Sequence, residues 1–92
     1  MDISRVDILD EDKLESKHGV REDEVRAVFR GAPRIRFIEG GHYQGEDVYA
    51  AYGQTEDGRY LTVFFVYKLS QVALVLSARD MDRKERNRYG RK

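Results

Sequence analysis

A chain of 92 residues with 40% hydrophobic side chains can bury one modest core and is too short for two independent domains, so we expect residues 1–92 to form a single domain. It carries 17 basic and 17 acidic residues and no cysteine, which excludes disulfides and thiolate metal sites and favours a cytoplasmic location. No apolar run approaches the ~20 residues that cross a bilayer, and no signal-peptide pattern opens the chain, so we expect neither membrane insertion nor export.

The first third of the chain predicts two short helices. Residues 3–9 alternate weakly between apolar and polar side chains, so they form either an initial strand or an extended lead-in. Residues 11–18 follow Asp10 as the N-cap, carry acids in the first turn and bases in the last, and stop at Gly19. A second helix has an acidic first turn at residues 22–24 and ends at Gly31 and Pro33, with one apolar face made by Val25, Val28 and Phe29.

After Pro33 the apolar period changes to about two, which indicates a move into sheet. Short turns separate four predicted strands: Arg34–Glu39, Val48–Tyr52, Arg59–Lys68 and Gln71–Ser77. A last helix, Asp82–Tyr89, opens with a capping box between Asp82 and Glu85. The predicted fold is therefore α+β, with two N-terminal helices, a four-stranded antiparallel meander and a C-terminal helix.

The third and fourth predicted strands carry apolar side chains at both odd and even positions, so both faces of the sheet centre must be covered. The two N-terminal helices can cover one face. The other face must be covered by the last helix, by a partner, or by both.

Charge is distributed unevenly along the neutral chain. Residues 77–92 hold seven basic residues beside three acids, whereas residues 1–24 hold nine acids and four bases. The N-terminal acids are typical of helix starts. The C-terminal bases lie where a strand meets a short helix, and arginines held in that way can bind phosphate.

Short motifs follow one another in this order along the chain: Lys17-His18-Gly19-Val20, Val28-Phe29, Gly45 to Gly53, Thr55 to Leu61, Val63-Phe64-Phe65, Ser77-Ala78-Arg79, and Glu85-Arg86 with Tyr89. This order, from about Leu9 to Tyr89, resembles the BrnT family of toxins from bacterial toxin–antitoxin pairs. The resemblance implies a RelE-like fold, an endoribonuclease that needs no metal, and neutralisation by a ribbon-helix-helix antitoxin of the BrnA type, through which the toxin can dimerise.

Two departures from the family pattern indicate a divergent branch. The family usually has an aromatic residue, often tryptophan, just before the first helix, where this chain has Leu9. It also tends to end the sheet with Ile-Ile-Ser-Ala-Arg, followed by a small residue and threonine. This chain has Val75 and Leu76 before the Ser-Ala-Arg triplet, and Asp80 and Met81 after it.

Metal-free RNA cleavage requires a base for the 2′-OH proton, an acid for the leaving oxygen and fixed positive charge at the phosphate. Arg79 continues the parity of Ala73 and Val75, so we expect it to project from the face opposite Leu74 and Leu76. Arg83 and Arg86 share one side of the last helix, and the three guanidiniums can converge on one phosphate. Alternatively, Arg79 is a structural ion-pair partner, and the helical arginines are solvated charges that pair with Asp80 and Asp82.

His18 and Tyr89 are the predicted proton-transfer residues beside Arg79. Histidine titrates near neutrality, but beside Lys17 at a helix end it can also serve only to favour the helix dipole. Tyr89 can donate a proton or stack on a base, or it can simply pack against the sheet. Glu85 can act as a base, although its capping position already gives it a structural role. We expect RNA contacts from Lys17, Arg59, Arg83 and Arg86; the structural alternative for Arg59 is an edge-strand charge.

Two histidines without a cysteine predict no zinc site, and the glycines at Gly40, Gly41 and Gly45 lack the strand–loop–helix context of a nucleotide-binding loop. We therefore assign no metal and no cofactor. Three functional hypotheses remain: a ribonuclease toxin, a non-catalytic module that binds a protein partner or nucleic acid through its basic C-terminal end, and a fold remnant without a partner.

Overall fold

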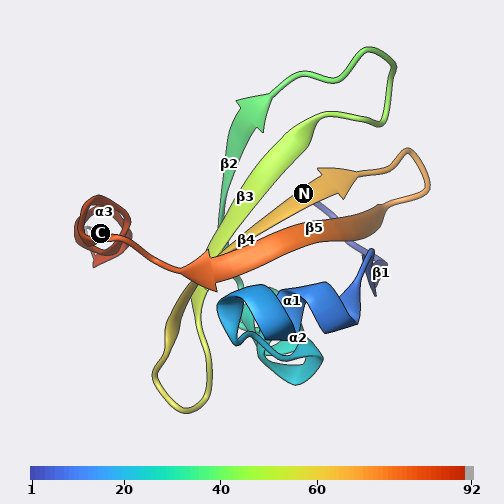
Figure 1. The fold of residues 1–92 in the computed structure, drawn as a ribbon. Helices are drawn as coiled ribbons and strands as arrows, with labels where there is room; N and C mark the ends of the chain where they lie inside the picture. The colour runs from blue at the N-terminus through green and yellow to red at the C-terminus, as the bar shows by residue number, and fades with distance from the viewer. Residues whose placement is uncertain (91–92) are drawn as a thin grey trace.

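The computed structural model describes residues 1–90, so Arg91 and Lys92, two of the seven bases in the C-terminal segment, lie outside the described residues. Three helices accompany one five-stranded sheet with the strand order β1-β5-β4-β3-β2 (Figure 1). The elements in chain order are β1 (Arg5–Ile8), α1 (Glu11–His18), α2 (Glu22–Arg30), β2 (Arg34–Glu39), β3 (Val48–Gln54), β4 (Tyr60–Tyr67), β5 (Val72–Asp80) and α3 (Arg83–Gly90). None of the three helices within residues 1–90 is long and apolar enough to cross a membrane.

The predicted four-stranded antiparallel sheet is wrong in one respect, because β1 adds a fifth strand in parallel to β5. Arg5 lies opposite Val72 and Ile8 opposite Val75. Strands β2 to β5 form the predicted antiparallel meander. The N-terminal segment is therefore a strand and not a lead-in. Its partner lies more than sixty residues away, so no local turn signal marks the pairing.

Helices α1 and α2 form at the predicted positions, and α1 has the predicted caps. The Lys13 amide donates to the Asp10 carboxylate at 3.0 Å, and Gly19 has a φ of 63°, the left-handed conformation that ends α1. Both helices lie on one face of the sheet (Figure 1). Between them and the sheet is the main core, built around Leu14, Val20, Val25, Val28, Ala51, Leu61, Val63, Phe65, Ala73, Val75 and Ala78.

The opposite face is covered only at one end, by α3. This helix follows the end of β5 and lies away from α1 and α2 (Figure 1). A second, smaller core beneath it contains Ala50, Tyr52 and Met81, with Tyr60, Phe64 and Tyr89 packed around them. The predicted capping box forms, since the Glu85 amide donates to Asp82 at 2.8 Å and the Asp82 amide donates to Glu85 at 3.0 Å. The helix itself begins one residue later than predicted, at Arg83.

A β-bulge in β5 reverses the predicted direction of Arg79. Phe65 pairs with Val75 and Phe64 pairs with Ser77, so Leu76 is an extra residue on the β5 side. One extra residue shifts the alternation of every later side chain to the other face. Ala78 therefore lies in the main core, and Arg79 lies on the α3 face, not on the face of Ala73 and Val75. The strand also continues past its predicted end at Ser77 to Asp80.

Candidate functional site

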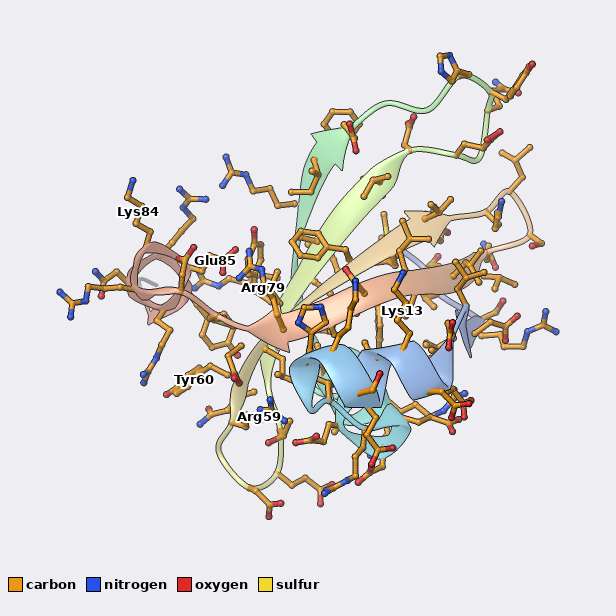
Figure 2. The ribbon with its side chains drawn as sticks, in the orientation of Figure 1. Lys13, Arg59, Tyr60, Arg79, Lys84 and Glu85 are labelled. Atoms are coloured by element: carbon orange, nitrogen blue, oxygen red, sulfur yellow. The ribbon has the colours of Figure 1, made fainter. Side chains whose placement is uncertain are left out.

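Arg79 and Glu85 form a two-point ion pair between β5 and α3 (Figure 2). The two terminal nitrogens of Arg79 lie 2.6 and 2.9 Å from the two carboxylate oxygens of Glu85. The guanidinium also lies over the ring of Phe64, 5.3 Å from its centroid. The Arg79 side chain is 37% exposed and that of Glu85 is 12% exposed. The pair is thus held tightly by packing, with the arginine side open to solvent.

Glu85 is the most fully bonded side chain in this region. Its carboxylate also accepts from the hydroxyl of Thr62 at 3.1 Å and from the Asp82 amide. Burial raises the pKa of Glu85, but the hydrogen bonds from Arg79 and the Asp82 amide outweigh this, so the net pKa is lowered. The hydrogen bond that Arg79 donates to Glu85 is likewise the main cause that raises the pKa of Arg79. Both groups are therefore charged near neutral pH.

The guanidinium of Arg79 keeps one edge without a protein acceptor. Nη1 donates to Glu85 and to the Asp80 carbonyl oxygen at 3.1 Å, while Nη2 donates to the other carboxylate oxygen. Within residues 1–90 no hydrogen bond uses Nε, and Nη2 has a second hydrogen. These two N–H groups point side by side, the geometry that matches a phosphate or carboxylate.

A hollow of about 650 Å³ lies between α3 and the start of β2, lined by Arg34, Tyr60, Arg83, Arg86 and Tyr89 among others. The rings of Tyr60 and Tyr89 meet edge to face, with centroids 6.0 Å apart. The Arg86 guanidinium lies 4.4 Å from the centroid of Tyr60, and that of Arg34 lies 5.8 Å from the centroid of Tyr89. The predicted residues Arg83, Arg86 and Tyr89 are thus brought together here, but Arg79 does not line this hollow.

A smaller hollow of about 190 Å³ adjoins the first and shares Arg34 and Tyr89 with it. Arg36 and Arg88 line it, together with Tyr52 and Glu85. Burial is the main cause that raises the pKa of Tyr52, followed by the charge of Glu85, so its phenol keeps its proton. Arg34, Arg36 and Tyr52 were not predicted as site residues, although strand parity places both arginines on one side of β2.

His18 and Lys17 line a different hollow, of about 200 Å³, at the open edge of β5. Leu76 and Ser77 form its sheet side, and it shares no residue with the hollows beside α3. Lys13 extends from α1 over β5 on the same edge (Figure 2). The structure therefore does not gather His18 and Tyr89 in one cavity. Ser77, which lines the hollow of His18, lies two residues from Arg79 along β5, so this hollow and Arg79 are on the same strand.

Arg59 lies inside a closed network on the α1 and α2 face. Its guanidinium bonds Asp80 at 2.7 Å and Glu24 at 3.1 Å. It also donates to the carbonyl oxygens of His18 at 3.3 Å and Gly19 at 2.8 Å. These bonds join the end of α1 to the end of β5 and occupy the side chain that was predicted to contact RNA.

No group of three or more histidine, aspartate or glutamate side chains within residues 1–90 is placed to hold a metal ion. The polar groups that gather in the described residues are instead arginine guanidiniums, with a few carboxylates and tyrosine hydroxyls beside them.

The fold and this site define a small α+β protein whose α3 end presents a cluster of arginines suited to a phosphate-bearing ligand. Residues 10–85 match the family described as the ribonuclease toxin, BrnT, of type II toxin–antitoxin systems, so the chain belongs to the BrnT toxin family. Membership implies an RNA target and an antitoxin partner. No curated protein shows significant similarity to the chain.

Proposed function

We propose that this protein is an endoribonuclease that cuts RNA without a metal ion, by attack of the 2′-OH on the adjacent phosphate. The observation that carries the proposal is the free Nε and Nη2 edge of Arg79, a half-exposed guanidinium fixed by Glu85 and Phe64. A guanidinium held in this way can receive a phosphate without leaving its ion pair. Preorganised positive charge of this kind stabilises the five-coordinate transition state most effectively.

His18 and Tyr89 are the proposed proton-transfer groups, and they line different hollows. His18 lies on the β5 edge with Lys17, and Tyr89 lies on α3 with Arg83 and Arg86. If His18 is the base, the scissile phosphate lies toward Ser77. If Tyr89 transfers a proton, the phosphate lies toward α3. The variants His18→Gln and Tyr89→Phe separate these two positions, because each should lower the cleavage rate by about 10²–10⁴-fold only if its proton transfer limits the reaction.

The direct test incubates the purified protein with single-stranded RNA in EDTA and analyses the ends of the products. Attack by the 2′-OH leaves a 2′,3′-cyclic phosphate and a 5′-hydroxyl. We expect such products from the native protein and from the control Arg5→Ala, which removes an exposed arginine of β1. Arg79→Ala should abolish them. Arg79→Lys keeps the charge but loses the paired N–H edge, so most activity should also be lost.

Intact RNA after prolonged incubation with well-folded native protein would reject the nuclease proposal. So would cleavage that appears only after Mg²⁺ is added.

The alternative is a non-catalytic module on the same scaffold, and two observations favour it. Arg79 is already paired with Glu85, and His18 and Tyr89 do not share a hollow. This alternative predicts RNA or partner binding that Arg79→Ala weakens, with no cleavage under any condition.

We further propose that the antitoxin is a ribbon-helix-helix protein of the BrnA type, and that toxin copies associate through it. A neighbouring short reading frame that encodes such a protein, and a complex that co-purifies and suppresses cleavage, are the expected results. A partner of unrelated fold would reject this part of the proposal and leave the nuclease assignment in place.

A further inference from the structure

The two hollows beside α3 share Arg34 and Tyr89, and we call their combined arginine-lined surface the β2–α3 groove. It is defined by Arg34, Arg36, Arg83, Arg86, Arg88 and Tyr89. Its five guanidiniums come from two elements that are far apart in the sequence. The single acidic side chain that lines it, Glu85, is already bound to Arg79. The groove is therefore strongly positive, although the chain as a whole is neutral.

The arginines of the groove are available for a ligand. All five are exposed, and within residues 1–90 none of them takes part in an ion pair. Arg34 donates one hydrogen bond, to the Arg88 carbonyl oxygen at 3.3 Å, which connects β2 to the end of α3. Uncompensated like charges on facing elements repel one another, and an anionic ligand would relieve that repulsion.

Aromatic rings lie among these charges. Tyr60 and Tyr89 each carry a guanidinium over the ring, so flat, polarisable groups alternate with positive charge. Basic grooves with interleaved aromatic residues are typical of proteins that bind single-stranded nucleic acid, where the backbone follows the charges. Arginine and tyrosine are also enriched at protein interfaces, so the choice of RNA rests on the number of uncompensated positive charges in the groove.

We propose that Arg34, Arg36 and Arg88 bind the sugar-phosphate backbone of a single-stranded RNA as it leaves the region of Arg79, so that the substrate site extends across β2. This inference rests on the proposed ribonuclease function. It assigns RNA contacts to Arg34 and Arg36, which lie outside the basic C-terminal segment, and to Arg88, for which the sequence predicted no role. The path follows from the order of the residues in space. Glu85 lines the smaller hollow and accepts the hydrogen bonds of Arg79, so the groove begins beside the proposed cleavage position.

The test measures binding separately from cleavage. A fluorescent 2′-O-methyl oligonucleotide has no free 2′-OH and cannot be cut by the proposed chemistry, so native protein can be titrated with it. The main variant is Arg36→Gln with Arg88→Gln, because neither side chain makes a hydrogen bond or ion pair within residues 1–90. The matched control is Arg5→Gln with Arg30→Gln, which removes the same charge from a hollow on the α2 face.

We expect the Arg36/Arg88 variant to bind roughly tenfold more weakly and to lower the slope of log affinity against log salt by about 1.4, the value for two phosphate contacts on a single strand. The control pair should change neither quantity appreciably. Arg34→Gln should weaken binding further, and circular dichroism and thermal unfolding would reveal any loss of its structural bond to α3.

Equal effects of the two double variants, or no effect of either, would overturn the inference. Loss of antitoxin binding with unchanged RNA binding would also overturn it and assign the groove to the protein partner. The outcome for the proposed function is read separately, from cleavage of unmodified RNA. Cleavage without groove-dependent binding removes the inference alone, and groove-dependent binding without cleavage removes the nuclease proposal alone.

Discussion

Arg79 and Asp80 are neighbours in β5, yet their side chains bind on opposite faces of the sheet. Arg79 pairs with Glu85 of α3, whereas Asp80 pairs with Arg59 on the face that carries α1 and α2 (Figure 2). The end of β5 is thus fastened to both layers within two residues. A ligand bound at Arg79 therefore meets a strand end that is held on both sides.

The substitution Glu85→Gln tests whether this ion pair supports the fold as well as the site. It removes the charge that faces Arg79 and leaves an amide that cannot accept all four of the present hydrogen bonds. Loss of a charged partner at a partly buried site costs about 1–3 kcal/mol in the free energy of unfolding. Urea unfolding should show this loss, with the exposed turn variant Glu56→Gln unchanged.

Arg59→Gln distinguishes a structural arginine from one that contacts RNA. The variant breaks bonds to Glu24, Asp80 and two backbone carbonyls at once, so we expect a loss of roughly 2–4 kcal/mol in unfolding free energy. Affinity for uncleavable RNA, measured at a temperature where the variant remains folded, should stay close to native. If stability is unchanged and RNA affinity falls, the structural interpretation is wrong.

Stability should fall in acid because the carboxylates of Asp80 and Glu85, like that of the exposed Asp23, titrate below their usual range in the folded state. The hydrogen bond from Arg59 is the main cause that lowers the pKa of Asp80. For Glu85, burial opposes the shift and the bonds from Arg79 and Asp82 outweigh it. Since the unfolded chain then binds more protons, the stabilisation is fully present above about pH 5 and is lost as the pH falls through the folded pKa values.

Urea midpoints measured between neutral pH and about pH 3 would trace this loss. Glu85→Gln should have a shallower acid limb than the native protein, because one of the carboxylates with a lowered pKa is gone. Parallel curves for the two proteins would show that Glu85 does not contribute to the pH dependence.

Gly53→Ala should destabilise the packing of α2 on β3. Gly53 is buried, and a Cβ there would lie 2.8 Å from Cγ1 of Val28. Such overpacking typically costs about 1–3 kcal/mol, because the helix or the side chain must shift. Thermal unfolding should therefore occur at a lower temperature than in the control Gly90→Ala, where no atom lies within 4 Å of the added carbon.

Local chemistry made most of the elements predictable. The Asp10 cap, the Gly19 stop and the Asp82–Glu85 capping box all act within a few residues, and the helices begin and end within about one residue of the expected positions. Strands β2 to β5 were predictable for the same reason, because the alternation of apolar side chains with a period of two is also a local property. Family membership, too, was read from short motifs in order, and residues 10–85 match that family.

The site depended on contacts that no local pattern encodes. The parity of β5 predicted the wrong face for Arg79, because the bulge at Leu76 is set by pairing with β4 and by packing of Ala78 in the core. Likewise, nothing near Arg34 and Arg36 indicates that α3 lies beside them. That proximity comes from the docking of a helix more than forty residues later in the chain.

The sequence alone determined the helices, the antiparallel meander, the basic character of the C-terminal segment and the family, since capping, alternation and motif order are properties of neighbouring residues. Only the tertiary structure decided the parallel β1–β5 pairing, the face on which Arg79 projects, the closed network of Arg59 and the separation of His18 from Tyr89. Each of these depends on strand pairing and packing between distant segments, whose free energy appears only once the chain has folded.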